Sequence, residues 1–170
     1  MKLKIRLIIM NFLQYAVWGA YLTSMGRYLA GAGMAENIGW FYAMQGVVSI
    51  FMPALAGIVA DRWLPAQKVL SICHTMAGAL MLAAGVYGLS TATPEFATLF
   101  TLYSFSVAFF MPTIALVNSV AYNALEKEGL DTVKAFPPIR VWGTVGFICS
   151  MWAVDLLGLK STAYQFAFSG

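Results

Sequence analysis

Three side chains in the last long apolar run of the sequence combine a positive charge, a hydroxyl and an aromatic ring. Arg140 lies near the start of the run, and Thr144 and Phe147 follow four and seven residues later. On a helix that turns about 100° per residue, the three fall within roughly 60° of one face. A guanidinium and a hydroxyl there can hydrogen-bond a polar solute while the ring stacks on it. The alternative is that Arg140 extends its charge to a nearby membrane interface.

A second polar stripe lies in the first apolar run. Amide, aromatic and thioether side chains recur there every three or four residues, at Asn11, Gln14, Trp18, Tyr21 and Met25. On a helix they occupy an arc of roughly 80°. This arrangement suits the lining of a polar cavity, although a helix–helix interface with aromatic residues at its end is the alternative. Gln14 and Trp18, with Asn118 of the fourth run, are therefore further candidate binding residues.

The composition indicates that these stripes lie in a membrane. Of the 170 residues, 61% are hydrophobic and 10% are charged, with seven acids against ten bases. An ordinary soluble domain is about a quarter charged, so the composition excludes a soluble enzyme, a nucleic-acid binder and a disordered chain. The two cysteines do not belong to a cluster of metal-binding residues, and no pair of a catalytic nucleophile and a base is evident. We therefore expect an integral membrane protein that is not an enzyme and holds no metal or cofactor.

Long stretches without charge define the expected helices. Each is about 20 residues or longer, enough to cross roughly 30 Å of hydrocarbon. We expect an all-α membrane bundle with an uncleaved first helix, rather than a signal peptide, and with helices at 5–28, 37–60, 67–90, 95–122 and 136–157, plus the start of a sixth at 161–170. The pair Pro137–Pro138 suits the start of the fifth helix, where amide hydrogens are unpaired.

The distribution of lysine and arginine predicts the orientation. If the N-terminus is cytoplasmic, the inside segments hold seven basic residues: Lys2, Lys4, Arg6, Arg62, Lys68, Lys127 and Lys134. The outside segments then hold two, Arg27 and Lys160. This bias predicts a multi-pass protein with its N-terminus in the cytoplasm. The polar stretch 126–134 is then expected to be a cytoplasmic linker.

The connection between the second and third runs has a more specific pattern. Gly57 is followed four residues later by Asp61 and Arg62, and then by Lys68, on a short turn. This pattern resembles the signature loop of the major facilitator superfamily, although Trp63-Leu64-Pro65 stands where a second glycine is usual. Gly57 would admit a close helix, while Asp61 and Arg62 would latch one conformation. The alternative is a charged turn that only follows the positive-inside bias.

Longer sequence segments indicate a particular branch of this superfamily. Phe51–Leu55, Ile72–Thr75 and above all Phe136–Phe147 are similar to the bacterial proton-coupled nucleoside permeases, the NupG-like branch of that superfamily. The resemblance covers essentially the whole chain and implies that Arg140, Thr144 and Phe147 contact the nucleoside. It also implies two helical bundles with the substrate between them, so that this chain is the N-terminal portion and the C-terminal bundle is absent from it.

The resulting expectation is a transporter of purine and pyrimidine nucleosides in the bacterial inner membrane, working by alternating access and driven by proton symport. Its expected partners are the nucleoside, protons, the lipid bilayer and the C-terminal half, but no nucleic acid. The alternatives are transport of another small solute, such as a sugar, and a structural membrane subunit without transport activity. No proton-coupling residue is assigned, because Asp155 lies near the outer end and the other acids lie in turns or at helix ends. His74 is interpreted as structural.

Overall fold

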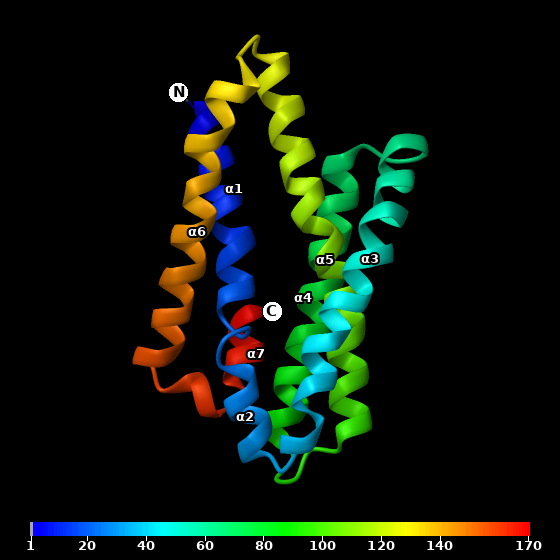
Figure 1. Cartoon of the computed structure of the whole chain (residues 1–170), viewed down its shortest axis with the longest axis vertical. Helices are drawn as coiled ribbons and strands as arrows, with labels where there is room; N and C mark the ends of the chain where they lie inside the picture. The colour runs from blue at the N-terminus through cyan, green and yellow to red at the C-terminus, as the bar shows by residue number, and fades with distance from the viewer. Residues whose placement is uncertain (1) are drawn as a thin grey trace.

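In residues 2–170, which the computed structural model describes, all regular secondary structure is helical (Figure 1). The α-helices are α1 (Lys2–Gly19), α2 (Met25–Gly31), α3 (Ile38–Arg62), α4 (Ala66–Ser90), α5 (Phe96–Lys127), α6 (Thr132–Leu156) and α7 (Tyr164–Ser169). Two short 3-10 helices, η1 (Ala35–Asn37) and η2 (Leu159–Ser161), lie before α3 and after α6. Among the described residues, four segments are long and apolar enough to cross a membrane: Ala35–Arg62, Ala66–Ser90, Phe96–Lys127 and Thr132–Leu156.

The first expected helix, 5–28, is interrupted in the structure. Residues 20–24 form a turn between α1 and α2. Tertiary hydrogen bonds stabilise this break: the Tyr42 hydroxyl donates to the Leu22 carbonyl at 2.9 Å, and Ser24 Oγ donates to Gln165 Oε1 at 2.7 Å. A continuous apolar pattern did not reveal the interruption, because it depends on partners far away in the sequence.

The predicted linker 126–134 is helical at both ends, because α5 continues to Lys127 and α6 begins at Thr132. Gly129, with φ of +67°, ends α5, and the Leu130 amide donates back to the Leu125 carbonyl at 3.0 Å. Asp131 then caps α6 by accepting from the Val133 amide at 3.0 Å. Glycine at a helix end and aspartate at a helix start are the residues that these positions favour. The turn between α5 and α6 is therefore only residues 128–131.

This early start changes the position of Arg140. The expectation that Pro137 and Pro138 begin the helix is wrong, because α6 starts at Thr132 and both prolines lie inside it. Arg140 is consequently about 12 Å along the axis from the first residue of α6, at about 1.5 Å per residue. The side chain begins well inside the helix rather than near its end.

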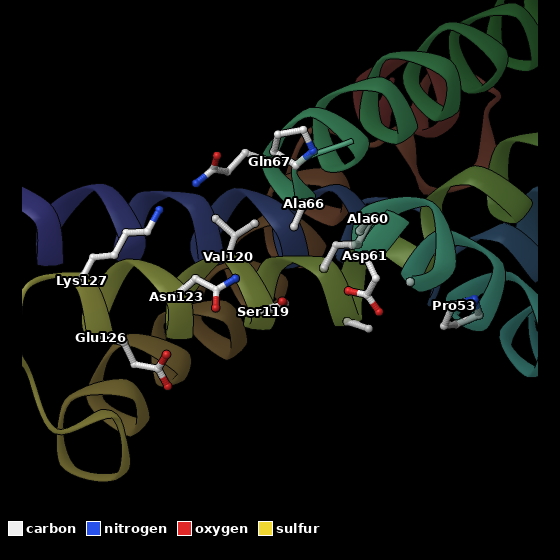
Figure 2. A pocket seen from close by; sticks show the side chains of 14 residues that line it. Pro53, Ala60, Asp61, Ala66, Gln67, Ser119, Val120, Asn123, Glu126 and Lys127 are labelled. Atoms are coloured by element: carbon white, nitrogen blue, oxygen red, sulfur yellow. The ribbon is translucent and has the colours of Figure 1, made fainter. Parts of the chain in front are cut away.

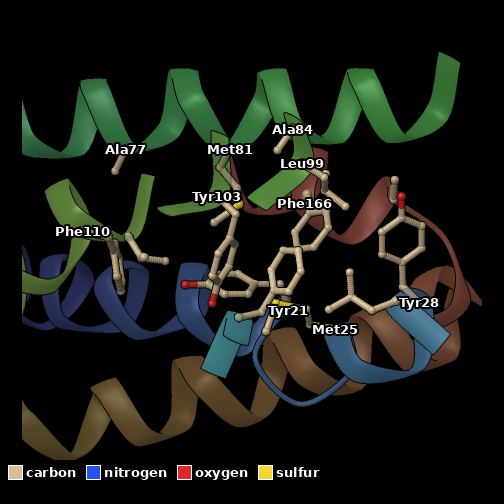
Figure 3. Close-up of a cluster of buried hydrophobic side chains, with 14 of the residues drawn as sticks. Tyr21, Met25, Tyr28, Ala77, Met81, Ala84, Leu99, Tyr103, Phe110 and Phe166 are labelled. Carbon is tan, nitrogen blue, oxygen red and sulfur yellow. The ribbon is translucent and has the colours of Figure 1, made fainter. Parts of the chain in front are cut away.

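The helices pack in two groups that α7 and a shared core connect. α1 runs along α6, while α3 and α4 pack against α5 and α7 packs against α4 (Figure 1). An aromatic core joins the groups, with Tyr21, Tyr103 and Phe166 in mutual ring contact (Figure 3). All three side chains are at most 1% exposed. This core fixes α1 relative to α5 and thereby positions the residues considered next.

The turns separate into two ends of the bundle. The start of α1, the turn after α3 and the turn between α5 and α6 share one end, and the turns before α3, before α5 and after α6 share the other (Figure 1). All the segments that were expected to be cytoplasmic are therefore at the same end.

Candidate functional site

The Arg140 guanidinium lies against Tyr15 of α1. Its Nη2 donates to the Tyr15 hydroxyl at 2.6 Å, and its Cζ lies 4.0 Å from the centroid of the Tyr15 ring. The guanidinium therefore makes both a hydrogen bond and a cation–π contact with one side chain. Within residues 2–170, no carboxylate forms an ion pair with Arg140. Its charge is held in place without being neutralised.

Trp18 extends this group from Tyr15 to Phe147. The Trp18 ring is 6.4 Å from the Tyr15 ring, and 6.2 Å from the Phe147 ring in an edge-on arrangement. Its indole N–H donates to Gln45 Oε1 at 3.0 Å, and Gln45 Nε2 in turn donates to the Tyr103 hydroxyl at 2.5 Å. Because the indole N–H of Trp18 already has a partner, Trp18 can contact a solute through its ring rather than through a hydrogen bond.

The residues expected on one face of α6 remain accessible. Arg140 and Phe147 are half-buried, and Thr144 between them is exposed. The structure therefore links Arg140 to Phe147 through Tyr15 and Trp18, and leaves Thr144 on an uncovered face of α6. Asn118 differs from these residues. Its side-chain oxygen on α5 is buried and has no hydrogen-bond partner among residues 2–170.

Gln14 is only 2% exposed and is held by two protein partners. Its Nε2 donates to Thr113 Oγ1 at 2.7 Å, and Thr113 donates onward to the Phe110 carbonyl at 2.5 Å. Gln14 Oε1 therefore faces His74 Nε2, at 2.7 Å. Since a carboxamide oxygen only accepts, the hydrogen of this bond belongs to His74 Nε2. The network connects α1 with α4 and α5.

Tyr15 is a member of this site that sequence reasoning missed, and His74 is one for which it named no partner. Tyr15 follows Gln14 directly, so on a helix it lies about 40° outside the stripe that begins at Asn11. Its contact with Arg140 spans 125 positions in the sequence. The signal for His74 was weak, since a lone histidine in an apolar run is most simply structural. The structure gives that structural role a definite partner, Gln14.

The His74 contact predicts a measurable loss of stability. His74→Phe should destabilise the full-length protein by about 1–3 kcal/mol, because Gln14 Oε1 would be left buried without a donor. The measurement is thermal unfolding of the purified protein in detergent. Thr75→Val is the matched control, since Thr75 is exposed on the same helix and its hydroxyl donates to the Ser71 carbonyl one turn earlier. Equal melting temperatures for wild type and His74→Phe would contradict the network.

Gly57 and Asp61 of the expected latch border a cavity of about 640 Å³ between α3, the start of α4 and α5 (Figure 2). Gly57, Asp61, Ser119, Asn123 and Glu126 are among its lining residues. A side-chain carbon at Gly57 would meet nothing within 4 Å. Asp61 and Arg62 are both exposed, and within residues 2–170 neither forms an ion pair. The cavity therefore has room for another helix beside Gly57.

Comparison with known proteins gives consistent matches along the chain. The family model described as nucleoside H+ symporter matches residues 1–169. Xanthosine permease and nucleoside permease NupG, both of Escherichia coli (strain K12), are each 42% identical to the chain. Each alignment covers 97% of this chain and 38% of the relative. The chain thus spans less than half the length of these curated relatives.

A solved structure supports the same conclusion about the fold. The crystal structure of nucleoside transporter NupG aligns with a TM-score of 0.87 and 39% sequence identity. The alignment covers 99% of this chain and 41% of that one. A crystal structure of a mutant of NupG aligns with a TM-score of 0.88. These matches confirm the predicted fold class, the helical bundle of the major facilitator superfamily.

Proposed function

This chain belongs to the nucleoside H+ symporter family, and from that premise we propose that the whole protein carries purine and pyrimidine nucleosides across the bacterial inner membrane together with protons. Arg140, Thr144 and Phe147 form the part of the nucleoside site that this chain supplies. A membrane transporter, rather than an enzyme, is what the family and the long apolar helices indicate.

The series of contacts from Arg140 through Tyr15 and Trp18 to Phe147 is the observation that carries the proposal. A nucleoside joins a flat aromatic base to a sugar that is rich in hydroxyl and ether oxygens. The rings of Trp18 and Phe147 offer surfaces for the base, and base–aromatic stacking contributes about 1–3 kcal/mol per base. The remaining N–H groups of Arg140 and the Thr144 hydroxyl suit oxygen atoms of the base or ribose.

A second helical bundle would complete this site. The binding face of α6 is uncovered in this chain, and the curated relatives are more than twice as long as the region matched. Alternating access would then be a rocking of the two bundles around a site at the membrane midplane. The acidic residues of this chain lie at helix ends and turns, so the carboxylate that binds the coupled proton is expected in the second bundle.

Direct binding measurements test the proposal. Purified full-length protein should bind uridine and adenosine with saturable isotherms, and proteoliposomes should take them up faster with an inward proton gradient. Binding of glucose with no nucleoside binding would favour the alternative of a sugar transporter. Absence of binding and uptake for both classes, with the protein folded, would favour a structural membrane subunit.

The basic residues predict which end of the bundle lies in the cytoplasm. In a cysteine-free variant of the full-length protein, single cysteines at Glu36 or Glu95 should react with an impermeant thiol reagent added to intact cells. Cysteines at Lys68 or Glu128 should react only after the membrane is opened. The inverse labelling pattern would place the N-terminus outside and remove the proposed cytoplasmic latch.

The latch predicts a kinetic effect at Asp61. Asp61→Asn should slow nucleoside uptake, by roughly threefold to tenfold if it shifts the balance between the inward-open and outward-open states by about 1 kcal/mol. Initial uptake rates in proteoliposomes measure this, with protein content held equal. Glu128→Gln, in the exposed turn at the same end, is the matched control and should leave uptake unchanged. An unaltered rate in Asp61→Asn would reduce Asp61 to a turn residue.

A further inference from the structure

We propose that Tyr15 is a positioning residue that orients the Arg140 guanidinium toward the solute. This inference rests on the proposed function, because it names the group that prepares Arg140 for a nucleoside. Tyr15 is 6% exposed, so it acts through Arg140 rather than by covering the solute itself. Neither the charge pattern nor the polar stripe of the sequence assigns it a role.

The geometry of the contact fixes the guanidinium in two ways. The phenol oxygen accepts from Nη2 at 2.6 Å, which sets the rotation of the guanidinium plane. Cζ lies over the Tyr15 ring, 4.0 Å from its centroid, so the cation also contacts the face of the ring. The Tyr15 hydroxyl and ring together form a seat for the guanidinium. A lysine ammonium has neither a plane nor a fork of donors, so this seat is specific for arginine. The other N–H groups of Arg140 are then presented from a fixed position.

The seat is built into the helix packing at Gly143. A side-chain carbon at Gly143 would lie 2.6 Å from Tyr15 Cδ2 and 2.9 Å from Arg140 Nη1. Both distances are shorter than real carbon contacts allow, so a larger residue at Gly143 would displace the tyrosine ring or the guanidinium. The sequence Arg140-Val141-Trp142-Gly143 thus provides the charged group and, one turn later, the space for its support.

The neutral character of the support has a consequence for the solute. A carboxylate in place of Tyr15 would also hold the guanidinium, but it would cancel the positive charge. The phenol oxygen and the ring satisfy Arg140 while its net charge remains available. Tyr15 should therefore favour solutes that present an electron-rich oxygen to Arg140, and its removal should weaken those solutes most.

A double-mutant cycle on the full-length protein tests the inference. Tyr15→Phe keeps the ring and removes the acceptor, and it should weaken uridine binding by roughly threefold to tenfold. In an Arg140→Leu background, Tyr15→Phe should change the affinity by less than about twofold, because no guanidinium remains to be oriented. Tyr122→Phe is the matched control, since Tyr122 is on the exposed side of α5 and should leave affinity unchanged.

Melting temperatures of the four ligand-free proteins give a second readout that does not depend on the solute. Tyr15→Phe and Arg140→Leu should be non-additive if the side chains contact each other. Additive melting effects, or an equal loss of affinity from Tyr15→Phe in both backgrounds, would overturn the inference and make Tyr15 a packing residue. Non-additive melting in a protein that binds no nucleoside would support the contact and overturn the proposed function.

Discussion

Replacing Arg140 by lysine in the full-length protein should weaken nucleoside binding by roughly tenfold to hundredfold, the loss expected when one charge-assisted hydrogen bond worth about 1.5–3 kcal/mol is removed. Lysine keeps the positive charge but loses the planar fork of donors. It also loses the fit to the Tyr15 ring and hydroxyl. Isothermal titration with uridine and adenosine measures the effect. Arg27→Lys, an exposed arginine on α2, is the matched control and should bind like wild type.

The neighbouring positions separate stacking from hydrogen bonding. Phe147→Ala should weaken all nucleosides because the base loses a stacking surface, and Phe147→Tyr should be milder because the ring remains. Thr144→Val keeps the shape of the side chain but removes the hydroxyl, so its loss of affinity reports hydrogen bonding. If Arg140→Lys and Thr144→Val both bind uridine and adenosine like wild type, the site on α6 is wrong.

The sequence was most informative about the membrane-spanning helices, because the exclusion of charge from hydrocarbon acts on each residue locally. It was least informative at helix ends. Charges at 126–134 suggested a linker, yet a helix tolerates charges where it emerges into water. The ends are determined instead by Gly129 with its positive φ and by the Asp131 cap. Both are local signals, and a prediction of helix ends from charge alone does not use them.

Long-range partners explain what sequence reasoning missed at the site. Angles on a helix grouped Gln14 with Trp18, and the structure places both facing other helices. The same angles excluded Tyr15, which nevertheless contacts Arg140, because two helices that cross bring more than one stripe into contact. His74 was interpreted as structural, and its contact of 2.7 Å with Gln14 joins two helices, α4 and α1, that are far apart in the sequence. Such pairings require the tertiary structure.

The second large effect is expected where α1 and α6 approach most closely. Gly146→Ala should destabilise the protein by about 1–3 kcal/mol, the usual consequence of overpacking, and Gly146→Val by more. A side-chain carbon at Gly146 would overlap the Phe12 carbonyl oxygen and lie 2.9 Å from the Phe12 carbonyl carbon. Thermal unfolding and the amount of folded protein in the membrane measure this. Gly46→Ala is the matched control, because the added carbon meets nothing within 4 Å and should be neutral or slightly stabilising.

The nature of the clash allows a sharper test. Gly146 faces backbone atoms of Phe12, so Phe12→Ala should not rescue Gly146→Ala. Gly143 faces the side chain of Tyr15, so Tyr15→Ala should partly restore the stability of Gly143→Ala. Rescue at Gly146, or none at Gly143, would contradict the packing of α1 on α6. Because the same packing places Tyr15 under Arg140 and Trp18 beside Phe147, Gly146→Ala should also weaken nucleoside binding in the fraction that remains folded.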